Sequence, residues 1–389
     1  MDISVLKEIL TQSTAPFREM QVLSLVERFL IDAKIPFFYD RAGNMLVGFE
    51  SEGQLKKALS KKSQVPMRIM MAHTDHPGFH GVRWLDEKTL SVKWLGGSPK
   101  KYLNYAKVWL ADETGNLTEG RLQDITIASH GFSIDKAVVK LKQALPGKRR
   151  PAAKKIFGGF KFRLPFWRSG NLVYSRAADD LVGVFCVIET IKKLFQNPSR
   201  KDQRSFLGLL TRAEEVGFVG AIAHFEQGWY KKANRDVICI SLEASRTLPG
   251  AQIGKGPVVR LGDRRTVFSA TALQALTQLA EKHIKGNYQR RIMDGGACEG
   301  SATTMLGLQT VGISIPLGNY HNEGYEGGQD CRGPRGPAPE FVHLKDIEHM
   351  LCLCQATAFD TQVWTKPWLQ PWSRLYKNYE VMKKHLNRS

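Results

Sequence analysis

The sequence lacks the features that mark secreted, disulfide-bonded and membrane-spanning proteins. It has no apolar run of roughly 18 or more residues, the length a membrane-spanning helix needs, and no signal-peptide start with charged, apolar and small residues in turn. Its six cysteines are scattered and form no Cys-x-x-Cys pair, as expected for reduced thiols rather than for disulfides or a zinc ribbon. We therefore expect a cytoplasmic protein with no membrane partner.

Acidic residues are scarce, because 37 Asp and Glu stand against 56 Lys and Arg and leave a net charge of +19. No Asp or Glu occurs between Lys136 and Ala178, and a second basic stretch, Lys366 to Arg388, is interleaved with Trp and Tyr. Such segments can bind nucleic acid, through phosphate contacts and stacking, or an acidic partner. A solvated basic surface explains the same pattern, and no zinc-finger or RNP-type signature accompanies it.

The chain is long enough for two domains, at 389 residues and 42% hydrophobic content. Helical periodicity over residues 1–35, broken near Pro16, predicts two helices. Between Gly78 and Gln123, short alternating apolar runs separated by turns predict a small all-β unit inserted into an α/β domain. We expect the basic segment up to Arg168 to return from this unit as an exposed stretch.

Five predicted buried strands are each followed closely by His, Asp or Glu. The runs 67–72, 171–175, 205–211, 237–242 and 311–316 lead to His73, Asp179, the pair Glu214 and Glu215, Glu243, and His321, respectively. Ligands of open α/β sheets bind beyond the carboxyl ends of the strands. Each residue alone has a simpler explanation, since acidic pairs favour helix starts and Asp180 is typical of a helix cap. Together, two His and several carboxylates describe the ligands of a metal site.

Five ligands can hold two ions with open positions only if one carboxylate is shared. With Asp179 as the bridge, His73 and Glu243 would complete one ion, while Glu215 and His321 would complete the other. Two ions arranged in this way activate a water between them and polarise a carbonyl group.

Two further carboxylates are predicted to assist catalysis. Glu214 is left free of metal, so it can take the proton of the attacking water and pass it to the leaving amine. Asp75 lies two residues after His73 and faces the same way in an extended chain, so it can orient the imidazole ring. The predicted reaction is hydrolysis of an amide or peptide bond.

Several stretches of the sequence carry a family resemblance. They are HTDHPGF at 73–79, AADDLVG at 177–183, AEEVGFVGA at 213–221, PGAQIGKGPVVRLGDR at 249–264 and NYHN at 319–322. Together they resemble the dinuclear metallo-aminopeptidases called tetrahedral, deblocking or glutamyl aminopeptidases, metallopeptidase family 42, up to about residue 360. The resemblance implies the same metal ligands and the same general base. The β unit, with Gly96-Gly97-Ser98-Pro99, also resembles this family, in which the unit drives oligomerisation.

Three positions depart from the family pattern. Glu243 stands where the family usually has Asp, and Leu181 stands where Arg is common. The Gly-Gly-Thr-Asp-Ala segment of the family is replaced by residues 295–300, GGACEG. These changes bear on metal spacing and on how a substrate is oriented.

We therefore expect an α/β fold with a mixed, mainly parallel sheet flanked by helices, of the zinc-exopeptidase type, with an inserted small all-β domain. Residues 1–76 and 166–363 are predicted to form a discontinuous catalytic domain. Residues 77–165 are predicted to form a β-barrel-like domain with its basic return segment, and residues 364–389 a basic Trp- and Tyr-rich extension.

The predicted function is removal of N-terminal residues from short peptides by a two-metal aminopeptidase. We expect two divalent ions, zinc with cobalt or manganese as alternatives, and a homo-oligomer assembled through the inserted domain. The positive charge suggests acidic peptides as substrates. One alternative is a carboxypeptidase or N-acyl amino acid deacylase of the same clan. Another is a peptidase-like scaffold that binds nucleic acid or an acidic partner through residues 136–178 and the C-terminal extension.

Overall fold

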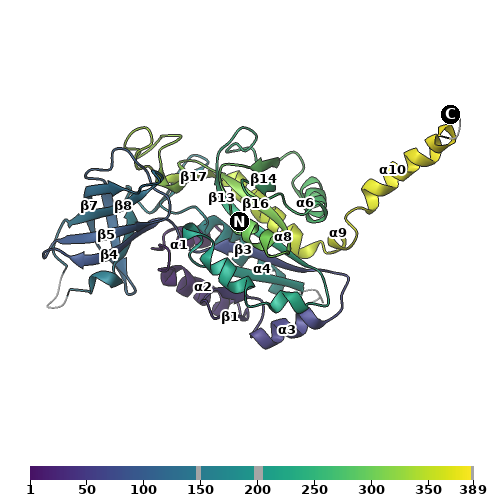
Figure 1. Cartoon of the computed structure of the whole chain (residues 1–389), viewed down its shortest axis with the longest axis horizontal. Coiled ribbons are helices and arrows are strands. Elements are labelled where there is room, and N and C mark those ends of the chain that lie inside the picture. Colours follow the sequence, from purple (N-terminus) through teal and green to yellow (C-terminus); the bar gives the residue numbers. More distant parts are fainter. Residues whose placement is uncertain (146–149, 197–204, 387–389) are drawn as a thin grey trace.

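A mixed eight-stranded sheet forms the centre of the protein in a computed structural model, which describes residues 1–145, 150–196 and 205–386 (Figure 1). The strand order is β1 (Phe37–Tyr39), β2 (Met45–Val47), β12 (Phe206–Thr211), β3 (Met67–His73), β13 (Val237–Arg246), β16 (Gln309–Leu317), β14 (Val258–Asp263) and β15 (Gln289–Met293). The four central strands, from β12 to β16, run parallel to one another. The predicted mixed, mainly parallel sheet is confirmed.

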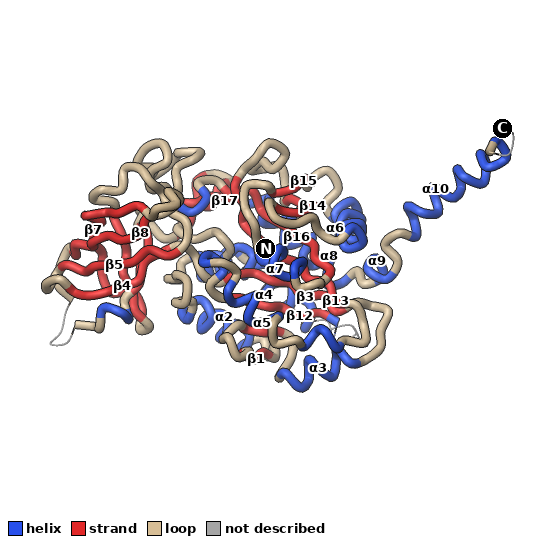
Figure 2. Tube along the Cα trace, in the orientation of Figure 1, coloured by secondary structure: helices blue, strands red, loops and turns tan. Residues whose placement is uncertain are grey.

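The central strands are buried on both faces, which explains their continuous apolar sequences. All seven residues of β3 are buried, and they alternate between two cores. Met70 and Ala72 face a core shared with the helices α1 (Ile3–Leu10), α2 (Met20–Asp32), α4 (Leu181–Phe195), α6 (Ala270–His283) and α8 (Leu344–Phe359). Ile69 and Met71 face the opposite core, which includes α3 (Glu52–Ser60) and α5 (Val219–Phe225). This two-sided cover, visible in Figure 2, fixes the strand ends from which the candidate ligands project.

A separate three-stranded sheet lies beside the main sheet, with the order β10 (Phe166–Ser169), β11 (Leu172–Ser175) and β17 (Glu340–His343). The strand predicted near Asn171–Ser175 therefore exists but belongs to this small sheet. It pairs antiparallel with β17, and Ser175 lies opposite Glu340. This pairing carries the start of β17 to the segment that precedes Asp179.

Six strands close into a barrel at the left of Figure 1, in the order β4 (Gly78–Trp84), β5 (Thr89–Leu95), β8 (Ile134–Leu141), β7 (Gly115–Ile127), β6 (Lys107–Asp112) and β9 (Phe157–Phe160). The segment expected to be an exposed basic return differs, because it supplies β8 and β9. In β8, the exposed Lys136 and Lys140 alternate with the buried Ala137 and Val139. A basic strand can thus line the barrel core with every second residue.

The C-terminal extension projects away from the rest of the protein (Figures 1 and 2). After the short helix α9 (Gln362–Thr365), helix α10 (Leu369–Met382) has no buried residue. Among the helices of the described residues, none has the length and apolar character to cross a membrane.

Candidate metal centre

His73 ends β3 and is almost fully buried, with 1% of its surface exposed. Its Nδ1 lies 3.1 Å from the backbone oxygen of Asp75, the distance of a hydrogen bond in which Nδ1–H donates. Its Nε2 lies 3.4 Å from Oδ1 of Asp179 and 4.0 Å from Oε2 of Glu214. With Nδ1 held by a carbonyl group, Nε2 is directed at the carboxylates as a metal ligand would be.

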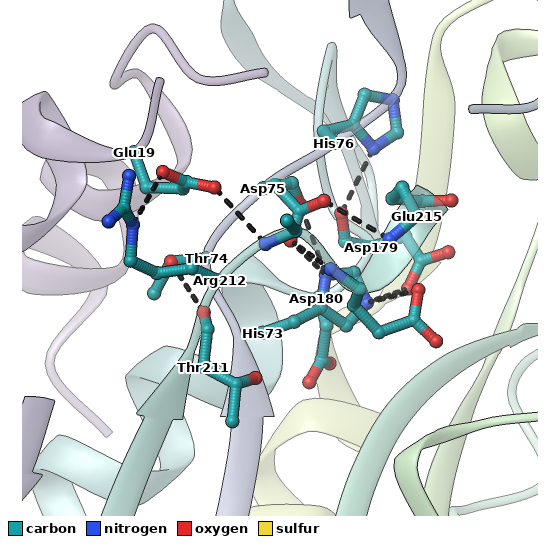
Figure 3. A network of polar contacts seen from close by, with 12 residues as sticks. Glu19, His73, Thr74, Asp75, His76, Asp179, Asp180, Thr211, Arg212 and Glu215 are labelled. Carbon is teal, nitrogen blue, oxygen red and sulfur yellow. Dashed lines mark hydrogen bonds and ion pairs between the residues drawn. The ribbon is translucent and has the colours of Figure 1, made fainter. Parts of the chain in front are cut away.

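Asp75 holds the backbone of the paired glutamates, and Figure 3 shows its contact with Glu215. Its Oδ1 accepts a hydrogen bond of 2.9 Å from the amide of Glu214, and its Oδ2 accepts one of 3.1 Å from the amide of Glu215. Its carboxylate is 3.6 Å from Nδ1 of His73, too far for a hydrogen bond. Asp75 therefore contacts the imidazole through its backbone oxygen, while its side chain fixes the short helix η3 (Glu214–Val216).

Glu19, which no sequence pattern singles out, supports the same turn. This buried residue precedes α2, and its Oε2 accepts a hydrogen bond of 2.8 Å from Nε of Arg212. Its Oε1 accepts one of 3.1 Å from the amide of Ala213, the residue before Glu214. The paired glutamates thus stand on a backbone held by two buried carboxylates (Figure 3).

Asp179 follows β11 and precedes α4, whose first turn is capped by Asp180. Oδ1 of Asp180 accepts a hydrogen bond of 3.2 Å from the amide of Gly183, as expected for a helix cap. The backbone oxygen of Asp179 lies 3.0 Å from Nδ1 of His76. His76 is a second buried residue beside the candidate ligands that sequence reasoning missed, although it directly follows the His-Thr-Asp stretch.

Glu340 connects the Asp179 segment to the His321 segment. Its Oε2 accepts hydrogen bonds from the amides of Ala178, at 2.7 Å, and Asp179, at 3.1 Å. Its Oε1 accepts one of 2.9 Å from the amide of His321, and its side chain is fully buried. One carboxylate thereby positions two candidate ligands. The only sequence signal for it was an isolated Glu immediately before the apolar run of β17.

His321 lies in the short helix η5 (Tyr320–Asn322), with Nε2 3.1 Å from Oε2 of Glu215 and 3.7 Å from Oδ2 of Asp179. The ring of Tyr320 stacks on it with the centroids 3.7 Å apart. A loop of the barrel covers the same imidazole. A Cβ atom on Gly97 would lie only 2.1 Å from Nδ1 of His321, so this position requires glycine.

Glu243 lies within β13 rather than at its end, which corrects the sequence prediction. The backbone pairing with β16 continues for three more residues, to Arg246. Burial raises the pKa of Glu243 to about 8, and Asp179 and Glu299 add to this effect, while Arg260 and His73 oppose it. The apolar run stops at Leu242 because the following side chains line the site, not because the strand ends.

The structure brings the predicted ligands together in two overlapping groups. His73, Asp179 and Glu243 form one group, and Asp179, Glu215 and His321 form the other, each with one candidate ligand atom per residue within 4.8 Å of the rest. Asp179 is common to both. A third group joins His73 to Glu214 and Glu215.

The donor set and the electrostatics of this cluster fit divalent cations. Burial raises the pKa of both Glu214 and Asp180 well above the ordinary carboxyl range, against the opposing effect of His73. Within the described parts of the chain, Oε1 of Glu215 and Oε1 of Glu243 are buried without a hydrogen-bond partner. A bound cation would satisfy buried carboxylate oxygens of this kind, and mixed imidazole and carboxylate donors suit divalent metals.

A cavity of about 110 Å³ has Glu243 in its lining. Arg260 lines it and is only 2% exposed, and neither its Nε nor one of its terminal nitrogens has a hydrogen-bond partner among the described residues. The guanidinium group of Arg246 lies over the ring of Tyr325 at 3.8 Å, on the same wall. Gly295 and Gly296, from the stretch that departs from the family pattern, also line this cavity.

The fold and the family match together support a metal-dependent aminopeptidase. More specifically, residues 157–325 match the family model of M42 glutamyl aminopeptidase, which confirms the prediction of metallopeptidase family 42. The matched segment contains Asp179, Glu214, Glu215, Glu243 and His321, whereas His73 lies before it. The match favours an aminopeptidase over the carboxypeptidase, deacylase and scaffold alternatives.

Solved structures share this fold over nearly the whole chain. The Pyrococcus horikoshii TET1 peptidase is 21% identical with a TM-score of 0.70, and the match covers 92% of this chain and 99% of that chain. An aminopeptidase from the archaeon Desulfurococcus kamchatkensis is 20% identical with a TM-score of 0.70, and the match covers 94% and 96%, respectively. An aminopeptidase from a marine sediment Thaumarchaeota archaeon is 18% identical with a TM-score of 0.64, with coverage of 92% and 98%.

Proposed function

We propose that two divalent metal ions bind in this centre and share Asp179. His73 and Glu243 would hold one ion, and Glu215 and His321 the other, as supported by the two overlapping groups of ligand atoms within 4.8 Å. Zinc suits this donor set, with cobalt or manganese as alternatives. When bound, such a pair of ions polarises the scissile carbonyl group and lowers the pKa of a water between them.

In this proposal Glu214 moves the proton. It belongs to neither of the groups that share Asp179, its Oε2 is 4.0 Å from Nε2 of His73, and it is 8% exposed. Its carboxylate takes a proton from the attacking water and gives it to the leaving amine. Asp75 positions this carboxylate by holding the amide of Glu214 at 2.9 Å.

The cavity beside Glu243 supports an acidic first residue in the substrate. Its volume of about 110 Å³ suits one side chain rather than a longer peptide segment. The partly unpartnered guanidinium of Arg260 and the nearby Arg246 offer donors to a carboxylate, and a guanidinium fork can bind a carboxylate bidentately. We therefore propose short peptides that begin with Glu or Asp.

We further propose that residues 1–76 and 166–363 act as the catalytic domain and that the barrel, within residues 77–165, joins copies of the chain. One solved relative is described as a dodecamer, and the TET1 peptidase can assemble into a tetrahedron or a large octahedral shell. The contact of Gly97 with His321 supports a role for the barrel close to the metal centre. Free cysteines throughout the described residues support a cytoplasmic location.

The central test compares Glu214→Gln with Glu215→Gln. We expect Glu214→Gln to keep the metal content of the wild type, measured by elemental analysis, and to lose hydrolysis of aminoacyl anilides. Glu215→Gln should lose both metal and activity. A Glu214→Gln protein with full turnover would contradict the proton-transfer role, and hydrolysis of N-acylated amino acids alone would contradict the aminopeptidase assignment.

A further inference from the structure

A cavity of about 570 Å³ lies between the barrel and the loop that joins η5 to β17. This loop is the yellow-green segment beside the barrel in Figure 1. The barrel side of the cavity is formed by residues at β6, β7 and the segment after β9, and the loop side includes Asp330, Arg332 and Pro337. The cavity shares no lining residue with the candidate metal centre.

The walls of this cavity are strongly basic. Its charged lining residues are Lys107, Arg121, Lys161, Arg163 and Arg332, with Asp330 as the one acidic residue in the lining. The basic segment singled out in the sequence contributes Lys161 and Arg163, and the proposed peptidase activity uses neither. The excess of positive charge therefore needs its own explanation.

Basic residues on adjacent strands of the barrel are paired with one another. Lys107 on β6 lies directly opposite Arg121 on β7, and Arg121 lies opposite Lys140 on β8. Lys161 continues this row, because its amide donates a hydrogen bond of 2.9 Å to the backbone oxygen of Lys107. Like charges directly opposite one another destabilise a sheet. A bound anion would remove this repulsion.

The available carboxylates do not neutralise the cavity. Asp330 is paired with Arg163, with contacts of 2.6 and 2.8 Å, and Lys161 is paired with Glu119. Arg121 and Arg332 donate instead to backbone oxygens, those of Tyr105 at 3.3 Å and Asn104 at 3.0 Å. Over the described residues, no ion pair joins Lys107, Arg121 or Arg332 to a carboxylate.

Two of these cations have lowered pKa values, first because of burial and second because of a neighbouring cation. Burial lowers the pKa of Lys161, and the nearby Lys107 lowers it further. Burial likewise lowers the pKa of Arg332, with Arg121 adding to the effect. Both shifts have the sign expected where positive charges lie together without enough negative charge nearby.

We propose that this cavity binds a small anion with several phosphate groups in series. Strands lie about 4.8 Å apart, so the row presents cations at a regular spacing to successive phosphates. Guanidinium groups such as that of Arg121 bind phosphate oxygens bidentately. Tyr105 lines the cavity and is 57% exposed, so its ring is available to stack on a nucleobase. Inorganic triphosphate and nucleoside triphosphates share the required chemistry.

The test is calorimetric titration of the full-length protein with inorganic triphosphate, ATP and orthophosphate at low salt. We expect saturable binding of triphosphate or ATP, weaker binding of orthophosphate, and a marked loss of affinity as salt is raised. Lys107→Gln and Arg121→Gln should each weaken binding by about 10-fold, since each removes a charge-assisted contact. Peptidase activity should stay at the wild-type level in both variants.

The matched control is Lys231→Gln, an equal change of charge at an exposed position outside the cavity. Triphosphate that binds to the metal ions would still bind to the double variant Lys107→Gln with Arg121→Gln. The affinity difference between this variant and the wild type therefore measures binding to the cavity. Tyr105→Ala should weaken ATP binding alone if a nucleotide is the ligand, and should leave both affinities unchanged if it is an inorganic chain. The proposal is overturned by unsaturable binding of both phosphate chains, or by equal losses in Lys231→Gln and the cavity variants.

Discussion

Replacing Glu340 with Gln should weaken metal binding without unfolding the protein. The carboxylate accepts three amide hydrogen bonds, two at the Asp179 segment and one at His321. A glutamine side chain has one oxygen, so its NH₂ group must face an amide N–H on one side. The most favourable orientation keeps the two bonds to Ala178 and Asp179 and leaves the His321 amide facing a donor.

The size of this effect follows from the buried position of Glu340, whose side chain is 0% exposed. A buried donor left unsatisfied costs roughly 1–3 kcal/mol. The metal-free protein can relax the His321 loop and avoid this cost, whereas the metal-bound protein cannot. Most of the cost should therefore lower the metal affinity, by roughly 10- to 100-fold, since 1.4 kcal/mol corresponds to a factor of ten. Titration of the metal-free variant with zinc, followed by activity and calorimetry, measures this loss.

Asp346→Asn is the matched control for this substitution. Asp346 also accepts two amide hydrogen bonds, from Gly254 at 2.6 Å and Gly256 at 2.8 Å, but it lies outside the metal centre. It should lower the melting temperature and leave zinc affinity unchanged. The reasoning would be refuted if Glu340→Gln bound zinc as tightly as the wild type, or if both variants lost affinity equally.

Three further predictions test other parts of the site. Gly97→Ala should reduce kcat/KM by at least about 10-fold, because its Cβ would collide with His321. The control Gly53→Ala should be active, because its Cβ would meet no atom closer than 3.8 Å. Equal activity of the two variants would contradict the contact between Gly97 and His321. Arg260→Met should raise KM for Glu-anilide by about 10-fold while sparing Leu-anilide, and a uniform change for both substrates would exclude charge recognition by the cavity. Chelation should abolish activity and lower the melting temperature, and added zinc, cobalt or manganese should restore both. If chelation leaves the melting temperature unchanged, this argues against ions bound to buried carboxylates.

The elements with local signals were predictable from the sequence. The apolar runs of β3, β12 and β16 and the capped helix α4 stand out because both faces of the sheet are covered. The candidate ligands were selected for the same reason, since a His or a carboxylate interrupts or follows an apolar run. The structure adds the distances that place them in two groups around Asp179.

Features that depend on distant partners were not predictable. The pairing of β11 with β17 joins Ser175 to Glu340, and no local pattern records it. Glu340, Glu19 and Arg260 are charged residues whose importance comes only from burial beside other segments. Strand β8 was missed because exposed basic residues dominated its local composition, and β9 because two of its four residues are glycines. Glu243 was placed at a strand end because side-chain polarity changes there while the backbone ladder continues.

The position of Glu340 also has a consequence for biosynthesis. Ribosomes deliver the chain from the N-terminus, so His73, Asp179, the paired glutamates, Glu243 and His321 all emerge before it. Until β17 leaves the exit tunnel and pairs with β11, the segments of Asp179 and His321 lack the carboxylate that holds them in register. The nascent protein therefore completes this centre only after β17 has left the ribosome, later than all of its candidate ligands.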